Sequence, residues 1–487
     1  MLQEEKKRLY TAFKAKDIRL DGRFFVGISS TGIYCRPICS ARQPKFENCT
    51  FYDSAAKAEQ AGYRPCLLCR PELAPGKARI DSKHALAQRA ARMIEENLGS
   101  GQQISHLAEA LGCTDRHLRR VFLAEYQVSP VQYLQTCRLL LAKNLLTDTS
   151  LSVLEVAMAA GFGSLRRFND LFKKHYHLSP TALRKKIPMG EEKQKGITVL
   201  LGYRPPYLWA QMLDFLKLRA IKGVELVREG SYLRTVRLQN NRGEPVYGHI
   251  KVKHCPEKTA LAVTISETLL PVLPQVLARV KHLFDLYCEP TAVFETLAQM
   301  NEIRPASCIE GTRVPGCFDA FEMIVRAVLG QQITVKAAGT LAARIVEAYG
   351  TPIKTGMEGL SHVFPAPEEI VALPGQIEAH LGSLGVIASR ARTIKRLAEE
   401  IAQKKIDFDF SVQPEIEIEK LLEIPGIGSW TAHYIAMRTM AWTDAFLETD
   451  AGIKKALSAY SPKERLALAE HWRPWRSYAT MNLWQSL

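Results

Sequence analysis

The sequence lacks any long apolar run. No stretch approaches 18 uncharged apolar residues, so no membrane-spanning helix is expected. The first 17 residues, MLQEEKKRLYTAFKAKD, are charged and lack the apolar core of a secretory signal peptide. The eleven cysteines are an odd number and mostly stand singly, which is not typical of a secreted disulfide framework. These absences predict a cytoplasmic protein with reduced thiols and no membrane partner.

Acidic residues are scarce in the N-terminal part of the chain. Of 487 residues 47% are hydrophobic, which is enough for several domains. Residues 1–195 hold 32 Lys and Arg against 19 Asp and Glu, whereas residues 196–487 hold 33 against 31. The net charge of +15 is therefore concentrated before residue 196. A positive field of this kind suits a polyanion such as nucleic acid, although a solvated basic surface gives the same balance.

Four cysteines stand in two close pairs, in the segments YCRPIC and RPCLLC. Their spacing is Cys35-x3-Cys39-x26-Cys66-x2-Cys69. Two short-spaced pairs from separate loops are what a tetrahedral site for one Zn²⁺ with four cysteine ligands requires. The spacing alone leaves open a purely structural zinc clip that holds a small domain together. Cys49 lies outside this spacing and is interpreted as a core residue or a surface thiol.

The surroundings of these cysteines carry a resemblance to a known family. Over residues 5–75 the motifs TGIYCRP-x-CSAR and RPC-x-x-C follow in order, and the segment resembles the zinc domain of Ada-type methylphosphotriester repair proteins. The resemblance implies that Cys35 accepts a methyl group from a methylated DNA phosphate in a single turnover. Four thiolates on Zn²⁺ carry a charge of about −2, and methylation would leave about −1, which strengthens DNA binding. An Ada-like PCHR segment is missing, which argues against reversal of O6-methylguanine.

A helical pattern occurs twice in residues 81–187. The apolar spacing of residues 104–112 returns at 153–161, and each copy ends in a glycine and is followed by a second helix, at 114–126 and at 164–176. One copy would fit an ordinary helical hairpin, but two with basic second helices favour DNA binding in a major groove. The residues expected to point inward are Leu118, Val121, Phe122, Phe168, Leu171 and Phe172, and those expected at DNA are Arg116, His117, Arg119, Arg120, Arg166, Arg167 and Asn169.

This repeat resembles the AraC-type tandem helix-turn-helix domain. The resemblance implies two recognition helices in successive major grooves of double-stranded DNA, a role in transcription regulation, and RNA polymerase as a further partner. Residues 188–196, within a stretch rich in charge and Gly, are expected to form a linker. After it, alternating segments such as SYLRTVRLQ predict an α+β unit over 197–283, and helical patterns continue over 284–487.

The segment LLEIPGIGSWTAHYIAMR, residues 421–438, predicts a helix that is broken and restarted. The break falls at Pro425, Gly426 and Gly428, and a second helix begins at about Ser429. Glycines let backbone N–H groups approach an anion, so the hairpin is expected to clamp a DNA phosphate, although other glycine-rich turns look alike. Asp450 follows 22 residues after Gly428, in front of AGIKKAL, where an N-cap role would by itself explain it.

Residues 197–487 resemble AlkA-type 3-methyladenine DNA glycosylases of the helix-hairpin-helix superfamily. The hairpin, the spaced aspartate, PPYLWAQMLDFL, RVPGCFDAFEMIVRAVLGQ and the terminal HWRPWRSYATMNLW carry the resemblance. It implies that Asp450 opposes positive charge as the N-glycosidic bond breaks. It also implies that Trp430, Tyr434 and Trp484 line an aromatic pocket for a flipped base, where cation–π attraction favours cationic alkylated purines.

Two positions refine this resemblance. Trp430 stands where glycosylases that also cut the backbone place a Schiff-base lysine, so the enzyme is expected to be monofunctional. Gln332 stands where some relatives insert an apolar wedge into the base stack, and a polar wedge fills the vacated space less well. No cysteine follows Cys317, so the C-terminal iron–sulfur cluster of some relatives is not expected.

The predicted protein is therefore multidomain and mainly α-helical. We expect a zinc-bound α+β methyl-acceptor domain (1–78), an all-α tandem helix-turn-helix (81–187), a linker (188–196), a TBP-like α+β subdomain (197–283) and an all-α helix-hairpin-helix glycosylase domain (284–487). The expected function is repair of alkylated DNA joined to transcription regulation. The alternative is a transcription regulator whose glycosylase-like half only binds DNA and whose zinc site is structural.

Overall fold

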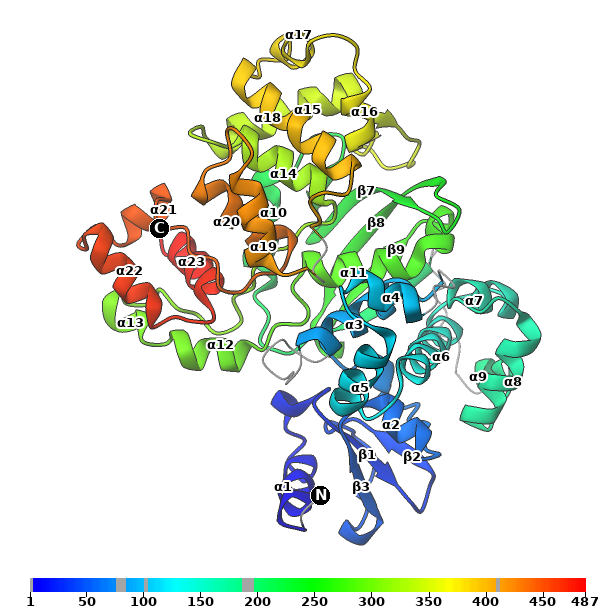
Figure 1. The fold of residues 1–487 in the computed structure, drawn as a ribbon. Coiled ribbons are helices and arrows are strands. Elements are labelled where there is room, and N and C mark those ends of the chain that lie inside the picture. The colour runs from blue at the N-terminus through cyan, green and yellow to red at the C-terminus, as the bar shows by residue number, and fades with distance from the viewer. Residues whose placement is uncertain (1–2, 76–84, 100–103, 186–196, 409–411) are drawn as a thin grey trace.

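The computed structural model describes residues 3–75, 85–99, 104–185, 197–408 and 412–487. Figure 1 shows an extended arrangement, with a small N-terminal sheet at the bottom, two groups of helices at the right, a larger sheet in the middle and a helical body at the upper left. This agrees with the predicted fold class. The predicted linker 188–196 lies outside the described residues. Within the described ranges, no helix has the length and apolar character needed to cross a membrane.

The zinc module, defined here as residues 3–75, is built on a four-stranded sheet of order β3-β1-β2-β4. Strands β2 (Ile33–Cys35) and β4 (Arg64–Pro65) pair in parallel, with Tyr34 opposite Pro65. Because both strands run the same way, Cys35 at the end of one comes beside Cys66 just after the other. The remaining elements are α1 (Gln3–Lys14), β1 (Phe25–Ile28), β3 (Cys49–Tyr52) and α2 (Ala55–Gln60).

The helix-turn-helix module, residues 85–185, repeats one structure twice. Helices α5 (Asp115–Tyr126) and α8 (Leu165–Tyr176) each begin at a hydroxyl N-cap, Thr114 or Ser164. Each ends at a left-handed residue, Gln127 or His177, with φ near +55°. The predicted inward side chains are buried, apart from Leu171, which is half-buried. The other helices are α3 (Ala85–Glu96), α4 (Ile104–Ala110), α6 (Pro130–Asp148), α7 (Val153–Ala159) and α9 (Pro180–Lys185).

The sheet module, residues 197–283, contains a five-stranded antiparallel sheet of order β5-β9-β8-β7-β6. The segment SYLRTVRLQ, whose alternation predicted a strand, is β7, and the module combines strands with helices as expected. Their bounds are β5 (Ile197–Gly202), α10 (Trp209–Arg219), β6 (Glu225–Arg228), β7 (Ser231–Gln239), β8 (Pro245–Cys255), β9 (Ala260–Ile265) and α11 (Leu273–Leu283).

The helical module, residues 284–487, contains one feature that the sequence did not predict. A two-stranded ribbon, β10 (Thr351–Pro352) with β11 (His362–Val363), interrupts the helices. Its helices are α12 (Pro290–Leu297), α13 (Met300–Ile303), α14 (Ala320–Leu329), α15 (Val335–Tyr349), α16 (Pro367–Val371), α17 (Ile377–Gly382), α18 (Ala388–Ala402), α19 (Pro414–Leu422), α20 (Ser429–Thr439), α21 (Ala451–Ala456), α22 (Pro462–Glu470) and α23 (Arg476–Gln485).

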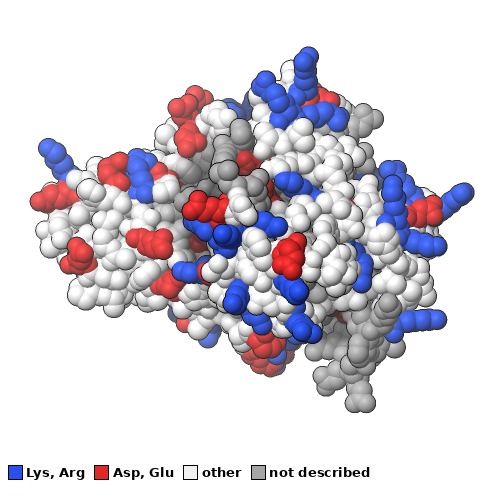
Figure 2. Space-filling view, turned by 90° about the horizontal axis from the view of Figure 1, so that it is seen from below, with Lys and Arg blue, Asp and Glu red and all other residues white. Residues whose placement is uncertain are grey.

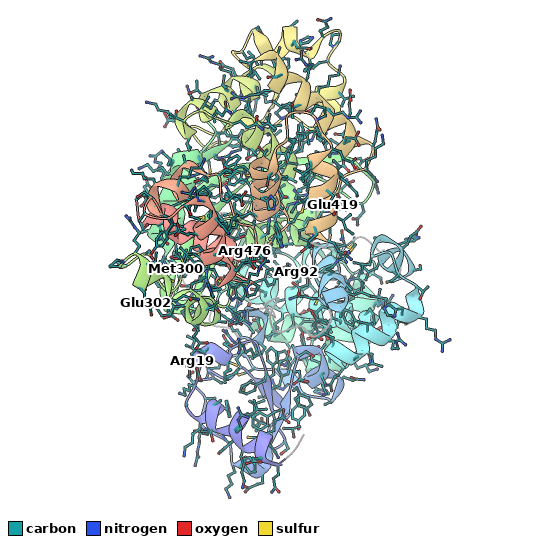
Figure 3. The ribbon with its side chains drawn as sticks, turned by 60° about the vertical axis from the view of Figure 1, so that its left-hand side comes forward. Arg19, Arg92, Met300, Glu302, Glu419 and Arg476 are labelled. Atoms are coloured by element: carbon teal, nitrogen blue, oxygen red, sulfur yellow. The ribbon has the colours of Figure 1, made fainter. Side chains whose placement is uncertain are left out.

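The modules are packed against one another. One hydrophobic core runs from α6, α7 and α8 into the five-stranded sheet and α11. Arg70 of the zinc module pairs with Asp148 of α6 at 2.7 Å. Glu95 of α3 accepts hydrogen bonds from Tyr133 and from Tyr287 of the helical module. Figure 3 labels Arg92 at this junction, where its guanidinium lies 4.9 Å from the ring centre of Tyr287. The four modules therefore share stability.

Candidate functional site

The four predicted zinc ligands converge. The sulfur atoms of Cys35, Cys39, Cys66 and Cys69 all lie within 4.8 Å of one another. Four thiolates about 2.3 Å from a shared Zn²⁺ stand about 3.8 Å apart in a tetrahedron, so the donor set fits the ion. The site thus holds one Zn²⁺ with four cysteine ligands. Cys49 is buried outside the cluster, where its thiol donates to the carbonyl of Lys45.

Arg36 ties the two halves of the cysteine cluster together. Its backbone N–H donates to Sγ of Cys69 at 3.3 Å, and its guanidinium donates to the carbonyl of Cys69 at 3.1 Å. The same guanidinium forms a buried ion pair with Asp21. Exposure within the cluster is uneven, because Cys35 is 2% exposed while Cys69 is half-buried. Cys35 is therefore almost completely covered, whereas Cys69 is partly accessible.

The predicted DNA-reading side chains point outward from both second helices. Arg116, Arg119 and Arg120 of α5 are exposed, as are Arg166, Arg167 and Asn169 of α8. Some already have partners, since Arg119 pairs with Asp115 at 2.9 Å and Arg120 contacts the ring of His117 at 3.0 Å. In the view from below, basic side chains gather toward the middle and right, the side of the helix-turn-helix module, while acidic ones are more frequent at the left (Figure 2).

The hairpin between α19 and α20 is shaped by its two glycines in different ways. Gly426 has φ +92°, and a Cβ there would lie 2.2 Å from Oγ1 of Thr393. Thr393, on α18, also donates to the carbonyl of Pro425 at 2.9 Å, which fixes the turn. A Cβ added at Gly428 would meet nothing within 4 Å, so the backbone there stays open to an approaching phosphate.

The loop after α14 is bonded to this hairpin. Nε2 of Gln331 donates to the carbonyl of Gly426 at 2.9 Å and to Oγ1 of Thr431 at 3.0 Å. Arg390 donates in turn to the carbonyl of Gln331. The next residue, Gln332, is exposed with φ +55°, a left-handed conformation that projects it from the surface. Gln331 therefore links the loop that carries Gln332, the predicted wedge, to the hairpin predicted to bind phosphate. The sequence analysis did not identify this residue.

Asp450 is held by four hydrogen bonds. It is the N-cap of α21, where Oδ1 accepts from the N–H groups of Gly452 at 2.8 Å and Ile453 at 3.1 Å. Oδ1 also accepts from the indole of Trp484 at 2.8 Å, and Oδ2 accepts from the indole of Trp430 at 3.1 Å. The N-cap role of Asp450 is confirmed, and its carboxylate also contacts the aromatic cluster.

The three predicted pocket aromatics lie together, but not as expected. Trp430 and Tyr434 stack on each other, with ring centres 5.1 Å apart and planes at 16°, because they are neighbours at i and i+4 on α20. Trp484 meets Tyr434 edge-on at 6.3 Å. Tyr434 is 8% exposed, whereas both tryptophans are half-buried. The two tryptophans are thus the more accessible members of the cluster, and Tyr434 is largely covered.

Arg438, one turn beyond Tyr434, is a residue that sequence reasoning missed. Its Nη1 donates to the phenol oxygen of Tyr434 at 2.7 Å. Its other N–H groups donate to the carbonyls of Pro315 and Gly316. The i, i+4 spacing from Tyr434 was a signal that could have identified it.

Four family models match the chain in succession. They are the metal binding domain of Ada at residues 8–72, a helix-turn-helix domain at 107–186, the AlkA N-terminal domain at 198–319, and the HhH-GPD superfamily of base excision DNA repair proteins at 325–470. Each match falls on the part of the fold where the corresponding geometry was found.

Three curated proteins illustrate the similarity. The "Probable bifunctional transcriptional activator/DNA repair enzyme AlkA" of Mycobacterium tuberculosis is 35% identical over 495 residues, which cover 100% of this chain and 97% of that protein. The "DNA-3-methyladenine glycosylase 2" of Escherichia coli is 35% identical, covering 58% of this chain and 95% of that protein. The "Bifunctional transcriptional activator/DNA repair enzyme Ada" of Escherichia coli is 35% identical over 26% of this chain and 34% of its own length. From the match along its whole length, the chain belongs to the family of AlkA-type bifunctional transcriptional activators and DNA repair enzymes.

Proposed function

We propose that the chain releases alkylated bases such as 3-methyladenine from double-stranded DNA, with Asp450 as the catalytic carboxylate. Two hydrogen bonds carry this proposal. The indole N–H groups of Trp430 on α20 and Trp484 on α23 both donate to the carboxylate of Asp450. A carboxylate needed only as an N-cap is already satisfied by Gly452 and Ile453. Two further donors fix its direction toward the aromatic pocket.

The proposed reaction uses this fixed charge. The damaged nucleotide leaves the duplex, and its base lies against the half-buried indoles. As the N-glycosidic bond breaks, its electron pair leaves with the base and positive charge develops on the sugar, opposite Asp450. Water then adds at C1′ and loses a proton to solvent. Gln332 would occupy the vacated place in the stack, while the hairpin at Pro425, Gly426 and Gly428 binds the backbone.

We also propose that the glycosylase is monofunctional. The position on α20 beside Asp450 is occupied by Trp430, which has no amine to form a Schiff base. The product would be an intact abasic strand that breaks only in hot alkali. Trapping of a covalent adduct by borohydride would contradict this part of the proposal.

The test is release of free base from methylated DNA by the full chain, wild type against Asp450→Asn. Asparagine keeps an oxygen that accepts from Gly452 and Ile453. The amide nitrogen that replaces Oδ2 cannot accept from the Trp430 indole, and the negative charge is lost. We expect release to fall by roughly 10² to 10³, with the melting temperature nearly unchanged. The control is Glu448→Gln, an exposed carboxylate two residues away, which should leave the rate unaltered. Undiminished release by Asp450→Asn would overturn Asp450 as the catalytic carboxylate, whereas no release by the wild type would favour the alternative, a half that only binds DNA.

The zinc centre is proposed to repair methylphosphotriesters. A bound Zn²⁺ keeps the ligand sulfurs as thiolates at neutral pH. The sulfur of Cys35 would attack the methyl carbon, the C–O bond would break, and its electron pair would stay on the phosphate oxygen, leaving a thioether and an ordinary phosphodiester. The test is mass analysis of peptides after exposure to methylphosphotriester DNA. Because Cys69 is more exposed than Cys35, a methyl group on the Cys69 peptide is the outcome that would overturn the assignment.

The regulatory part of the proposal joins these sites. Methylated Cys35 would tighten DNA binding by the recognition helices, with RNA polymerase as the further partner at a promoter. We propose the domain limits 1–78, 81–187, 197–283 and 284–487, and a cytoplasmic protein associated with the nucleoid when it is bound to DNA. This part is tested with a DNA fragment enriched by the methylated protein. RNA synthesis from it by purified RNA polymerase is compared with and without that protein.

A further inference from the structure

Arg438 is a buried cation with an unusual set of partners. It is 4% exposed, and its donors are satisfied by two backbone carbonyls and by the phenol oxygen of Tyr434. Among the described residues, no carboxylate lies within ion-pair distance of Arg438. Arginine stays protonated in proteins, and a buried charge is costly unless an opposite charge is near. Tyr434 is the ionisable group that its side chain contacts.

The surroundings of Tyr434 carry an excess of positive charge. Arg326 of α14 bonds to Glu225 and Glu322, and Arg234 of β7 bonds to Glu322. These two carboxylates are thus shared by two arginines. Two more cations, Arg438 of α20 and Arg219 of α10, face the same region, and each has its guanidinium over the ring of Phe215, at 4.9 and 3.7 Å from the ring centre.

We propose that Tyr434 works as an ionised phenolate, held by Arg438 and Arg219, and that this buried anion sets the preference of the pocket for cationic bases. The inference deepens the proposed function and rests on it. The phenol proton is released to solvent, and the negative charge is shared between the phenol oxygen and the ring.

The balance of charges agrees with this proposal. Burial by itself would raise the pKa of Tyr434, but the attraction of Arg438, Arg219 and Arg326 and the hydrogen bond from Arg438 bring it below the ordinary value. Asp450, a charged group near the stacked rings, contacts the indole of Trp430, which separates it from Tyr434. Trp484 of α23 contributes an uncharged edge.

The stacked pair carries the effect to the base. Trp430 lies parallel to Tyr434 at 5.1 Å and is the more exposed of the two. A cation on the outer face of Trp430 is attracted by the indole and by the anion behind it, whereas a neutral base gains much less. Tyr434 is thus a specificity-determining positioning residue, while Trp430 makes the contact.

The first test is spectroscopic and needs no substrate. The ultraviolet difference spectrum between the full-length wild type and Tyr434→Phe should show a tyrosinate band that appears at lower pH than that of an ordinary tyrosine. The matched control is Tyr478→Phe, since burial raises the pKa of Tyr478 well above its ordinary value, and this variant should show no such band. In Arg219→Gln the band should move to higher pH. Arg438→Gln should move it further, and since Arg438 also holds two backbone carbonyls, its result counts only alongside Arg219→Gln.

The second test compares substrates. The ratio of kcat/KM for 3-methyladenine, a fixed cation, to that for a neutral base such as hypoxanthine should rise with pH as Tyr434 ionises. In Tyr434→Phe the ratio should fall roughly tenfold and become independent of pH. Base release without a tyrosinate band, or with an unchanged ratio in Tyr434→Phe, overturns this inference alone. A tyrosinate band without any base release overturns the proposed function.

Discussion

The zinc centre and the aspartate site both hold negative charge in a fixed position, but they are built in different ways. Under the proposed function, each would place negative charge beside an electron-poor carbon. At the zinc centre four sulfurs lie within 4.8 Å of one another, and all come from residues 35–69. At the aspartate site one carboxylate is held by four N–H donors on residues 430, 452, 453 and 484.

The difference lies in what happens to the charge. Under the proposed function a sulfur gives up its charge by forming a bond, so the zinc centre acts once and its new state can serve as a signal. Asp450 keeps its charge, because its donors stabilise the carboxylate without reacting with it, so the site can turn over. Under the proposed function, an anion held in place by its surroundings would serve as a switch in the zinc module and as a catalyst in the helical module.

The largest expected effect separates the two centres completely. Cys35→Ser should abolish methyl transfer, because a serine hydroxyl is not a thiolate at neutral pH, while base release continues at the wild-type rate. Mass analysis and the free-base assay on the same preparation check both statements. Cys49→Ser, a buried cysteine outside the cluster, should still accept one methyl group. Because Cys35→Ser also removes a ligand, zinc content is measured alongside, and transfer by a zinc-loaded Cys35→Ser chain would contradict the assignment.

A smaller effect is expected when one indole donor to the Asp450 carboxylate is removed. Trp430 is the donor to Oδ2, whereas Oδ1 accepts from Trp484 and two backbone N–H groups. Trp430→Phe should therefore lower kcat by about 10- to 100-fold through one lost charge-assisted hydrogen bond, and Trp484→Phe by less. Single-turnover base release measures both. Equal losses in the two variants would mean that the orientation of Oδ2 is not what Trp430 supplies.

The sequence predicted the zinc ligands and the repeated helices better than the aspartate site. Metal-ligand spacing is local, and the parallel pairing of β2 with β4 simply brings the two cysteine pairs together. The repeat at residues 104–126 and 153–176 was likewise visible as apolar periodicity. Asp450 and the aromatics were identified by resemblance, since composition alone gives an N-cap and core packing.

What the sequence could not provide is the set of contacts between distant segments. Gln331 and Gly426 are 95 positions apart, and their hydrogen bond depends on how α14 packs beside α20. The stacking of Trp430 on Tyr434 depends on the packing around α20, and the i, i+4 spacing fixed only that they are neighbours. The shared core of the helix-turn-helix and sheet modules was also not predicted, because the composition of residues 188–196 led us to expect a linker between them.

The two glycines of the hairpin allow a comparison within one turn. Gly426→Ala should lower the free energy of unfolding by about 2 kcal/mol, because φ is +92° and the new Cβ would clash with Thr393. Gly428→Ala has room and an ordinary φ of −97°, so unfolding should not change while affinity for DNA falls. Urea unfolding and a binding titration separate these effects. Normal DNA affinity in Gly428→Ala would show that no phosphate approaches that backbone.

The smallest expected effect concerns the signal sent by the zinc centre. Methylation of Cys35 removes about one negative charge near the bound backbone, so the methylated protein should bind DNA several-fold more tightly at low salt. The gain should shrink with added salt, since the screening length is about 10 Å at 0.1 M. Binding titrations over a series of salt concentrations measure it, with a Cys35→Ser chain treated with the same methylated DNA as the control. Equal affinity of the two forms at every salt concentration would leave Cys35 as a site of repair alone. It would contradict the proposal that the zinc centre acts as a switch.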